Sequence, residues 1–573
     1  MKKSIIKYRL QLFMFFCIMA AIYIWSFAHL RIVFGSGDLM FQANRIEELY
    51  QDVIHGVFVP RISTYTFNQV GSGINFFYPW ILLYPFVIFQ LITHNPISAF
   101  YLGIFLETLV TLLLSYYAMR KYSASKKRAI IFAITYTFAN YRLYLVFNQN
   151  VLAESFAYTF LPLVLLGFYE VFYQNIKSWP ILAIGMTMLL YSHMLTTALT
   201  ALFMLVTLVV TWRWISNKRL RLLAGVKAAG LSFLLSAFYL VPFFEQTVTN
   251  HLKASWVGLL FIKTPMETIT SSINNEPTQV VGLLLMIVLI FGFFFWRRAN
   301  TIDRYTYLSG IILVALTTTL FPWAKLLNTP VANLQFPYRL TGLATLMLAI
   351  YLSAVVTYIF DNLQNRYGIS KIGFVVIFSL LSVGLTYSAE QQILAQRISI
   401  PMLDRVPTPS HYYPEEHGKG YNLTSSNWNN MFHYYSHNGS FDYFPVTING
   451  DNVTDLVTHH AFVNGRKVAF ASRLKSKPNE IVYDLSGIKS GTVVELPILY
   501  YHNDLVKVGE SNYLKPTSTK RTTVKIKVPV KDKTVSLKYF NSKLDNGSML
   551  VSILTWLGLI IVYFKYKLSG KEE

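Results

Sequence analysis

Apolar runs of about twenty residues recur along this chain and constrain its fold more than any other feature. One follows the basic start MKKSIIKYR, and others fall near 98–119, 154–173, 222–243 and 339–360. A helix of that length crosses a hydrocarbon core of roughly 30 Å. Only 14% of the residues are charged, whereas soluble proteins carry about a quarter. The sequence therefore predicts an α-helical polytopic membrane protein.

Basic residues between the apolar runs indicate which loops are cytoplasmic. The clusters RKYSASKKR, WRWISNKRLR, WRRANTIDR and DNLQNRYGISK all fall on one side if the chain has about twelve spans and both termini are cytoplasmic. The net charge of +22 is therefore interpreted as loop charge and not as nucleic-acid binding. The predicted spans are 11–30, 98–119, 129–147, 154–173, 179–198, 199–216, 222–243, 278–296, 305–323, 339–360, 371–388 and 547–565.

The apolar stretch 76–93 is an exception to this pattern. Pro79 and Pro85 interrupt it, and a crossing there would place the basic loop 120–128 outside. We therefore predict a juxtamembrane or re-entrant helix on the outer side.

A polar segment at about 389–546 separates the eleventh predicted span from the last. Within it, TTVKIKVPV and KTVSLKYF alternate apolar and polar residues, with turn sequences such as SGIKSG between them. Alternation of period two indicates half-buried strands. We predict a transmembrane core at 1–388 with an outer loop at 31–97, an extracytoplasmic β-rich domain at 389–546, and a last helix with a cytoplasmic tail at 547–573.

Several polar or ionisable residues fall in the outer loop or at the outer ends of the predicted spans. They are Asp38, Arg61, Arg142, Glu154, His193, Gln335 and Arg339. Ionisable residues at membrane depth are costly and face protein or water, which makes them functional candidates. Each has a structural alternative on its own: an arginine that reaches the headgroups, an acid at a helix amino terminus, or a packed histidine. Their convergence on one face favours a site.

Two carboxylates beside several cations at an outward-facing groove fit glycosyl transfer from a lipid-phosphate donor. A carboxylate can accept the proton of the attacking hydroxyl, and arginine matches the oxygens of the departing phosphate. We therefore expect Asp38 and Glu154 to be catalytic, and the other five residues to bind substrate. No glycine-rich nucleotide cradle occurs in the sequence, which agrees with a donor that arrives in the bilayer.

Five segments resemble one bacterial family in the order that this family shows them. GDLMFQANRIEELYQDVIHGVFVPR, GSGINFFYPW, NYRLYLVFNQNVLAES, YSHMLTT and LQFPYRL are similar to YfhO-type membrane proteins, including those labelled 6-pyruvoyl-tetrahydropterin-synthase-related. An acid after the first span and a long outer loop also look like the membrane glycosyltransferases of the GT-C class. Members of the family often have an Arg-Gly pair where this chain has residues 148–151, which puts a neighbouring cation of Glu154 in doubt.

The resemblance implies a GT-C-like fold and an inverting transferase on the outer face of a bacterial plasma membrane. The donor would be a polyprenyl-monophosphate sugar and the acceptor a cell-envelope glycopolymer, so the expected partners are these two and the lipid bilayer. In the class, the acid of the first loop is the usual catalytic base, which carries over onto Asp38.

Two other functions stay open at this point. A transporter or flippase of an envelope lipid would also need cations at headgroup level, although no paired halves with interrupted helices are evident. A non-catalytic assembly factor could have the fold alone. No cofactor is predicted, and a divalent metal stays open. The histidines of the polar segment, such as His411 with His417 and His433 with His437, match zinc-ligand spacing only loosely.

Overall fold

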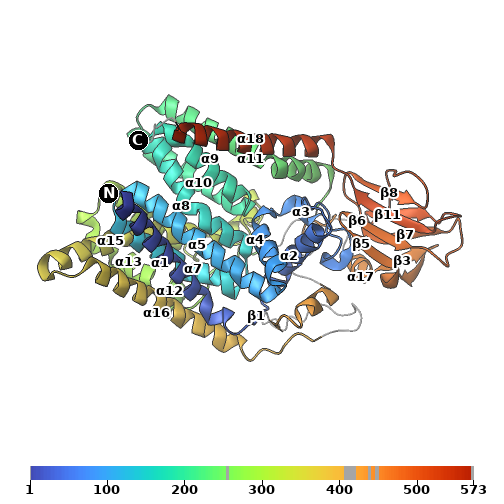
Figure 1. Cartoon of the computed structure of the whole chain (residues 1–573), viewed down its shortest axis with the longest axis horizontal. Coiled ribbons are helices and arrows are strands. Elements are labelled where there is room, and N and C mark those ends of the chain that lie inside the picture. Colours follow the sequence, from blue (N-terminus) through green and yellow to red (C-terminus); the bar gives the residue numbers. More distant parts are fainter. Residues whose placement is uncertain (1, 253–256, 405–420, 436–440, 446–450, 569–573) are drawn as a thin grey trace.

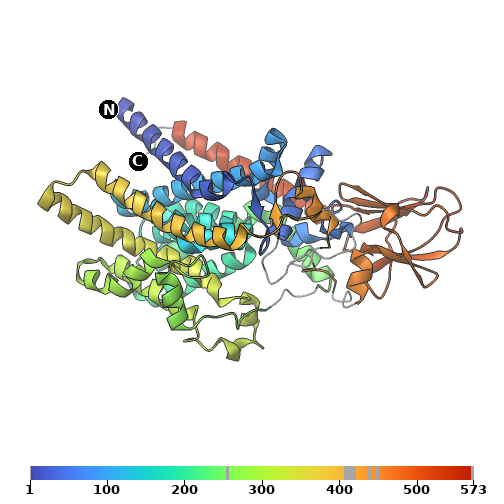
Figure 2. The ribbon, with the colours of Figure 1, turned by 90° about the horizontal axis from the view of Figure 1, so that it is seen from below.

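The computed structural model describes residues 2–252, 257–404, 421–435, 441–445 and 451–568. A bundle of helices occupies one end of the elongated molecule and a β-rich region the other, with small helices and loops between them (Figures 1 and 2). The start of α1 and the end of α18 both lie at the end of the bundle away from the strands (Figure 1). The fold is mostly helical, with a C-terminal β-rich region before the last helix, as predicted.

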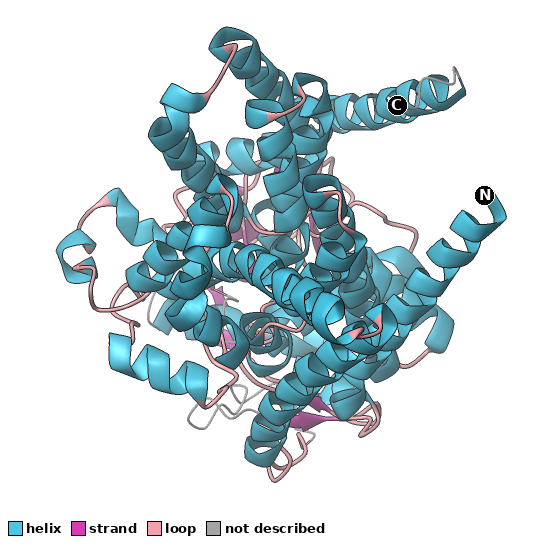
Figure 3. Cartoon of the chain, turned by 90° about the vertical axis from the view of Figure 1, so that its left-hand side faces the viewer, coloured by secondary structure: helices cyan, strands magenta, loops and turns pink. Residues whose placement is uncertain are grey.

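Eight helices among the described residues are long and apolar enough to cross a membrane, and a bent pair adds a ninth. The eight are α1 (Lys2–Ala28), α5 (Pro96–Ser123), α8 (Leu152–Tyr173), α10 (Met194–Thr211), α11 (Lys218–Thr249), α15 (Leu340–Tyr367), α16 (Lys371–Arg397) and α18 (Lys543–Leu568). The pair joins α6 (Lys126–Thr137) to α7 (Asn140–Leu143) and η3 (Tyr144–Asn148) at an angle of 40°. Seen from the end, these helices form a bundle in front of the strands (Figure 3). The chain is therefore a multi-pass membrane protein.

Three of the predicted spans contain shorter helices. α9 (Trp179–Leu190), α13 (Leu283–Phe291) and α14 (Thr301–Leu316) have 12, 9 and 16 residues. The predicted boundary between residues 198 and 199 is wrong, because α9 ends at Leu190 and α10 begins at Met194. The extended backbone of His193 (φ −154°, ψ 112°) interrupts the helix there. The count of twelve spans stays a prediction.

A layer of small helices lies between the bundle and the strands. It contains α2 (Leu39–Ile54), α3 (Ile74–Phe77), η2 (Ile81–Leu83) and α4 (Tyr84–Thr93) (Figure 1). α4 has 10 residues, too few to cross a bilayer, which agrees with the prediction that 76–93 is not a span. Two further small helices are α12 (Pro265–Ile273) and α17 (Asp451–Val457).

Two antiparallel sheets form the β-rich region, with strand orders β4-β3-β7-β10-β9 and β5-β6-β11-β8. The strands are β3 (His460–Val463), β4 (Arg466–Ala469), β5 (Leu474–Lys477), β6 (Glu480–Asp484), β7 (Val493–Leu499), β8 (Asp504–Val508), β9 (Thr517–Ser518), β10 (Thr523–Lys527) and β11 (Thr534–Tyr539). Alternate residues of both sheets, including Leu496, Ile481 and Leu537, form one hydrophobic core. The two alternating sequence segments correspond to β10 and β11.

Backbone pairing joins the loop after α1 to distant parts of the chain. β1 (Val33–Phe34) pairs antiparallel with β2 (Asn422–Leu423). The Leu499 amide donates a 2.9 Å hydrogen bond to the Val70 carbonyl. These contacts fix the layer of small helices against the segments that follow α16.

Candidate functional site

Asp38 lies at the start of α2, in a turn that packs on the segment before α8. Gly37 has φ +53°, and a Cβ atom there would lie 2.4 Å from the carbonyl oxygen of Gln149. The Asp38 amide donates a 2.8 Å hydrogen bond to that same oxygen, and the Ser36 hydroxyl donates to the Asn148 carbonyl at 2.8 Å. Position 37 therefore requires glycine both for its left-handed backbone and for the close approach.

The Asp38 side chain is half-buried and makes no capping hydrogen bond to α2. Its charge acts on the hydroxyl groups of Tyr78 and Tyr338, so it lies within electrostatic range of both. Burial, followed by the charges of Tyr443 and Asp38, raises the pKa of Tyr78, and this phenol stays protonated at neutral pH. The helix-cap alternative for Asp38 thus lacks the hydrogen bond that defines a cap.

A second carboxylate, Glu154, lies in the first turn of α8 beside a tyrosine and an arginine. Its Oε1 atom accepts a 2.6 Å hydrogen bond from the Tyr141 hydroxyl. Its Oε2 atom lies 3.6 Å from Nε of Arg339. These three side chains and Thr196 line a small cavity. Because Tyr141 holds one oxygen of Glu154, the other oxygen is directed toward the cation.

The guanidinium group of Arg339 has unpaired hydrogen-bond donors within the described part of the chain. Its Nε and Nη1 atoms are buried and have no hydrogen-bond partner within the described part of the chain. The group lies over the ring of Phe336, 5.3 Å from its centroid. Buried donors without acceptors are costly. An anion with several oxygens would satisfy them, because the guanidinium fork matches such a group.

Arg45 and His193 belong to the same group of side chains. The charges of Arg339 and Arg45 both act on the imidazole of His193. Arg45 lies over the Tyr78 ring, 5.1 Å from its centroid, and donates to the Pro79 carbonyl. Both arginines thus act on His193, and both also act on Tyr78, the tyrosine on which Asp38 acts.

We refer to Asp38, Arg45, Glu154, His193 and Arg339 as the charged cluster. Three of its members, Glu154, Arg339 and Asp38, have charges that act on the Tyr338 hydroxyl. The cluster therefore combines two carboxylates with two arginines and one histidine.

Two of the arginines that the sequence predicts to bind substrate are paired with carboxylates inside the protein. Arg61 forms a buried ion pair with Asp545 at the start of α18. Arg142 is fully buried, donates a 3.0 Å hydrogen bond to Thr108 Oγ1 and lies 3.6 Å from Glu107 Oε1. A buried cation needs such a carboxylate. Both arginines also have donors without a partner in the described part of the chain, but their side chains are 3% and 0% exposed, against 10% for Arg339. We therefore leave both out of the proposed substrate site.

The main chain of Gln335 forms a hydrogen bond and part of a turn. Its carbonyl accepts a 2.9 Å hydrogen bond from the Gly258 amide, and its φ angle is +64°. It belongs to the turn that precedes Arg339, and we leave its side chain out of the proposed substrate site as well.

The sequence did not single out Arg45, Tyr78, Tyr141 or Tyr338. Two of them carry a weak signal, because Tyr78 and Tyr338 each stand beside a proline, in FYPW and FPYR. Arg45 stands in NRIEELY, where polar residues on an amphipathic helix ordinarily face solvent. In the structure this helix is covered on nearly all sides, and Arg45 is 2% exposed.

Metal binding is not assigned to the charged cluster. Within the described residues, no group of three or more His, Cys, Asp or Glu side chains could hold a metal ion. His459 is buried and pairs through Nδ1 with the Tyr483 hydroxyl at 2.8 Å. His411, His417 and His437 lie outside the described residues.

Three solved structures resemble this chain at low sequence identity. Arabinofuranosyltransferase AftD from Mycobacteria aligns with a TM-score of 0.47 and 11% identity, over 92% of this chain and 40% of its own. ArnT from Cupriavidus metallidurans aligns with a TM-score of 0.43 and 10% identity, over 75% of this chain and 85% of its own. The Archaeoglobus fulgidus oligosaccharyltransferase aligns with a TM-score of 0.39 and 12% identity, over 67% and 56%. This chain thus spans less than half the length of AftD.

No curated protein matches the chain significantly. A family of membrane proteins, described as the 6-pyruvoyl-tetrahydropterin synthase related domain, matches residues 76–391. This range includes Glu154, His193 and Arg339 and covers more than half of the chain. The chain therefore belongs to the 6-pyruvoyl-tetrahydropterin synthase related membrane proteins.

Proposed function

We propose that this protein is a membrane glycosyltransferase, which moves a sugar from a polyprenyl-monophosphate donor to a cell-envelope polymer with inversion at the anomeric carbon. The observation that carries the proposal is the position of Arg339, which lines a small cavity with Glu154 and has two buried donor atoms without a hydrogen-bond partner in the described part of the chain. Such a transfer needs a base and a phosphate ligand close together. We propose that the reaction takes place on the outer face of a bacterial plasma membrane.

Asp38 is the proposed base. The acceptor hydroxyl oxygen attacks the anomeric carbon while Asp38 accepts the hydroxyl proton. The bond between that carbon and the phosphate oxygen breaks, and the polyprenyl phosphate leaves with the electron pair. Attack from the side opposite the leaving group inverts the carbon. The half-buried position of Asp38 supports this role, because a base must be reachable by the acceptor.

Arg339 is the proposed phosphate ligand, and Arg45 adds positive charge beside it. Among the residues that the structure describes, two donor atoms of Arg339 have no partner, and one of Arg45, its Nε atom, has none. A departing phosphate oxygen gains negative charge in the transition state, so donors fixed in advance stabilise it more than the ground state.

Glu154 is best explained as a positioning residue for Arg339. Both of its oxygens are already directed, one at the Tyr141 hydroxyl and the other at the Arg339 guanidinium. We therefore assign the proton transfer to Asp38 alone, and the orientation of the phosphate ligand to Glu154.

The place of the cluster supports a donor that arrives in the bilayer. Arg339 lies in the first turn of the candidate membrane span Pro337–Tyr367, directly before α15, whereas Arg45 comes from the layer of small helices. A lipid phosphate at the membrane boundary would lie at the same depth as the end of such a span. A polymeric acceptor could approach from the β-rich region, which lies at this end of the bundle (Figure 1).

The test is transfer by the purified full-length protein. It would be incubated with a panel of polyprenyl-phosphate hexoses and pentoses and an envelope polymer fraction, and free polyprenyl phosphate and labelled polymer would be measured together. Release of lipid phosphate with labelling of the polymer is the expected result, and Asp38→Asn should lower the rate of both by on the order of a hundredfold or more. Movement of the lipid-linked sugar between leaflets of proteoliposomes, without transfer, would favour the flippase alternative and overturn the proposal.

A further inference from the structure

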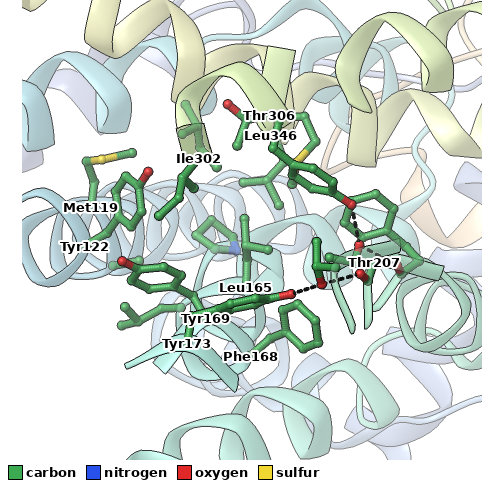
Figure 4. Close-up of a pocket in the computed structure, with 18 of the residues that line it drawn as sticks. Met119, Tyr122, Leu165, Phe168, Tyr169, Tyr173, Thr207, Ile302, Thr306 and Leu346 are labelled. Atoms are coloured by element: carbon green, nitrogen blue, oxygen red, sulfur yellow. Dashed lines mark hydrogen bonds between the residues drawn. The ribbon is translucent and has the colours of Figure 1, made fainter. Parts of the chain in front are cut away.

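A cavity of about 270 Å³ lies at the other end of the helical bundle, away from the charged cluster. α8 contributes Leu165, Phe168 and Tyr169 to its wall, α10 contributes Thr207, and α14 contributes Ile302; Figure 4 shows these side chains around one space. The volume is near the lower end of the range of about 300–1,000 Å³ that ligand pockets have. It suits part of a chain-like molecule better than a whole lipid.

The wall of the cavity is apolar because its hydroxyl groups are already paired. The Tyr173 hydroxyl bonds Thr211 Oγ1 at 2.6 Å, and the Tyr305 hydroxyl donates to Thr207 Oγ1 at 2.8 Å. Tyr122 donates to a carboxylate oxygen of Asp303 at 3.3 Å. These hydroxyl groups thus have partners within the protein, and their aromatic rings line the cavity. A hydrocarbon chain in the cavity would leave none of these hydroxyl groups without a hydrogen-bond partner.

The cavity lies beside a surface that meets the hydrocarbon of the bilayer. α10, which provides one wall, exposes large apolar side chains on its other face, with Leu202 55%, Leu205 57% and Val209 69% exposed. In a helix that is long and apolar enough to span a membrane, this face contacts lipid. The hydroxyl bond between Tyr305 and Thr207 joins α10 to α14 at the edge of the cavity.

Basic residues stand close in sequence to residues of the cavity wall. Arg120, Lys121, Arg213, Arg298 and Arg304 are each within three positions of a wall residue. Two acids lie equally close, Glu170 and Asp303, and Asp303 forms an ion pair with Arg128 at 2.5 Å. The surplus of positive charge would attract an anionic headgroup to the level at which an attached chain could enter.

We propose that this cavity takes one acyl chain of an anionic glycerophospholipid, whose headgroup lies near Lys121 and the neighbouring arginines. This site is separate from the charged cluster and does not depend on the proposed transferase function.

Photocrosslinking of the full-length protein in lipid nanodiscs tests the proposal. The probe is phosphatidylglycerol with a diazirine at the end of one acyl chain, and phosphatidylcholine with the same chain is the charge control. We expect phosphatidylglycerol to label segments 165–169 and 203–207 severalfold more than phosphatidylcholine does. Equal labelling by both lipids would overturn the proposal, as would displacement of the probe by polyprenyl phosphate. Mapping on the unaltered chain makes this test independent of any variant.

Variants then test the cavity and the headgroup site separately. Leu165→Trp should fill the cavity and reduce labelling severalfold, whereas Leu205→Trp, on the exposed face of α10, should leave it unchanged. Lys121→Gln combined with Arg213→Gln should remove the preference for phosphatidylglycerol, whereas Arg366→Gln, an exposed arginine at the end of α15, should not. Labelling that survives Leu165→Trp would show that the chain lies elsewhere.

Discussion

The Nε atom of Arg339 lies 3.6 Å from Oε2 of Glu154, so the two charges are paired but no hydrogen bond joins these atoms. Glu154 is held from its other side by the Tyr141 hydroxyl at 2.6 Å. The arginine is thus oriented by a fixed carboxylate and still has donors available. Arg142 has the same 3.6 Å distance to its carboxylate, Glu107, and among the described residues its Nε and Nη1 atoms also have no hydrogen-bond partner. The two arginines differ in exposure, because the side chain of Arg142 is 0% exposed and that of Arg339 is 10% exposed.

Arg339→Ala is expected to remove about 2–3 kcal/mol of transition-state stabilisation, because a charged contact to the leaving phosphate is lost. Arg339→Lys retains the charge but not the fork, and should also lose activity. The measurement is the rate of polyprenyl phosphate release by the purified variants. Arg366→Lys, at the far end of the same helix, is the matched control and should be unaffected. A normal rate for Arg339→Ala would refute the phosphate role.

Asp38→Asn is expected to lower turnover by on the order of a hundredfold or more, because asparagine cannot accept the acceptor proton. Binding of the donor should persist, since the phosphate ligands are unchanged. Asparagine caps helices about as well as aspartate, so a purely structural Asp38 would predict near-normal activity. Asp532→Asn, an exposed change in the β-rich region, controls for the substitution itself. Kinetics with binding measured in parallel separate the two outcomes.

Gly37→Ala is expected to reduce activity without contacting substrate. The added Cβ would lie 2.4 Å from the Gln149 carbonyl, and φ is +53°, so the turn that carries Asp38 must move. Gly230→Ala lies in α11 with open space around the new Cβ and should be neutral. If Gly37→Ala were fully active, the position of Asp38 would not be set by this turn.

Much of the fold could be predicted because lipid allows few alternatives. Apolar runs of sufficient length must form helices there, and alternating residues identified β10 and β11. The break between α9 and α10 could not be predicted from hydropathy, because residues 179–216 read as almost continuously apolar. The interruption depends on the backbone of His193.

The candidate site could be predicted only in part, because partners distant in sequence decide what an arginine does. Arg45 and Arg61 both stand in the predicted outer loop. Arg61 is neutralised by Asp545, 484 positions away, whereas Arg45 lies over Tyr78 and acts on His193. No local pattern separates these two cases.

Arg61→Ala is expected to destabilise the protein by about 3–5 kcal/mol, because the Asp545 carboxylate would be left buried without its cation. Adding Asp545→Asn should recover part of the loss. Thermal unfolding of the full-length protein in detergent measures both. Lys127→Ala is the matched control, since its partner Asp361 is 46% exposed, and such a pair contributes about 0–1 kcal/mol. Equal losses for Arg61→Ala and Lys127→Ala would contradict the prediction.

The β-rich region is expected to lose stability as the pH rises, through Asp504. This residue is buried, and its Oδ2 atom accepts a 2.7 Å hydrogen bond from the Tyr501 amide. Burial raises the pKa of Asp504 to about 8, although that hydrogen bond acts in the opposite direction. In the unfolded chain an aspartate titrates at about 3.9.

Between pH of about 4 and about 8, the folded state retains a proton that the unfolded state has released, so the free energy of unfolding falls with rising pH. The stability that depends on protonated Asp504 is fully present below the pKa that this residue has in the unfolded chain. It is lost as the pH rises through the pKa of Asp504 in the folded protein, about 8. Asp504→Asn keeps an acceptor for the Tyr501 amide and cannot ionise, so it should match the parent protein near the acid end of this window and be more stable near the alkaline end. The measurement is the rate of amide hydrogen exchange in β8 and β11, taken for the variant and for the parent protein at each pH and expressed as a ratio. Glu510→Gln, which changes an exposed acid nearby, is the control, and its ratio should not change with pH. A ratio that stays constant across the window would mean that Asp504 is ionised in the folded protein.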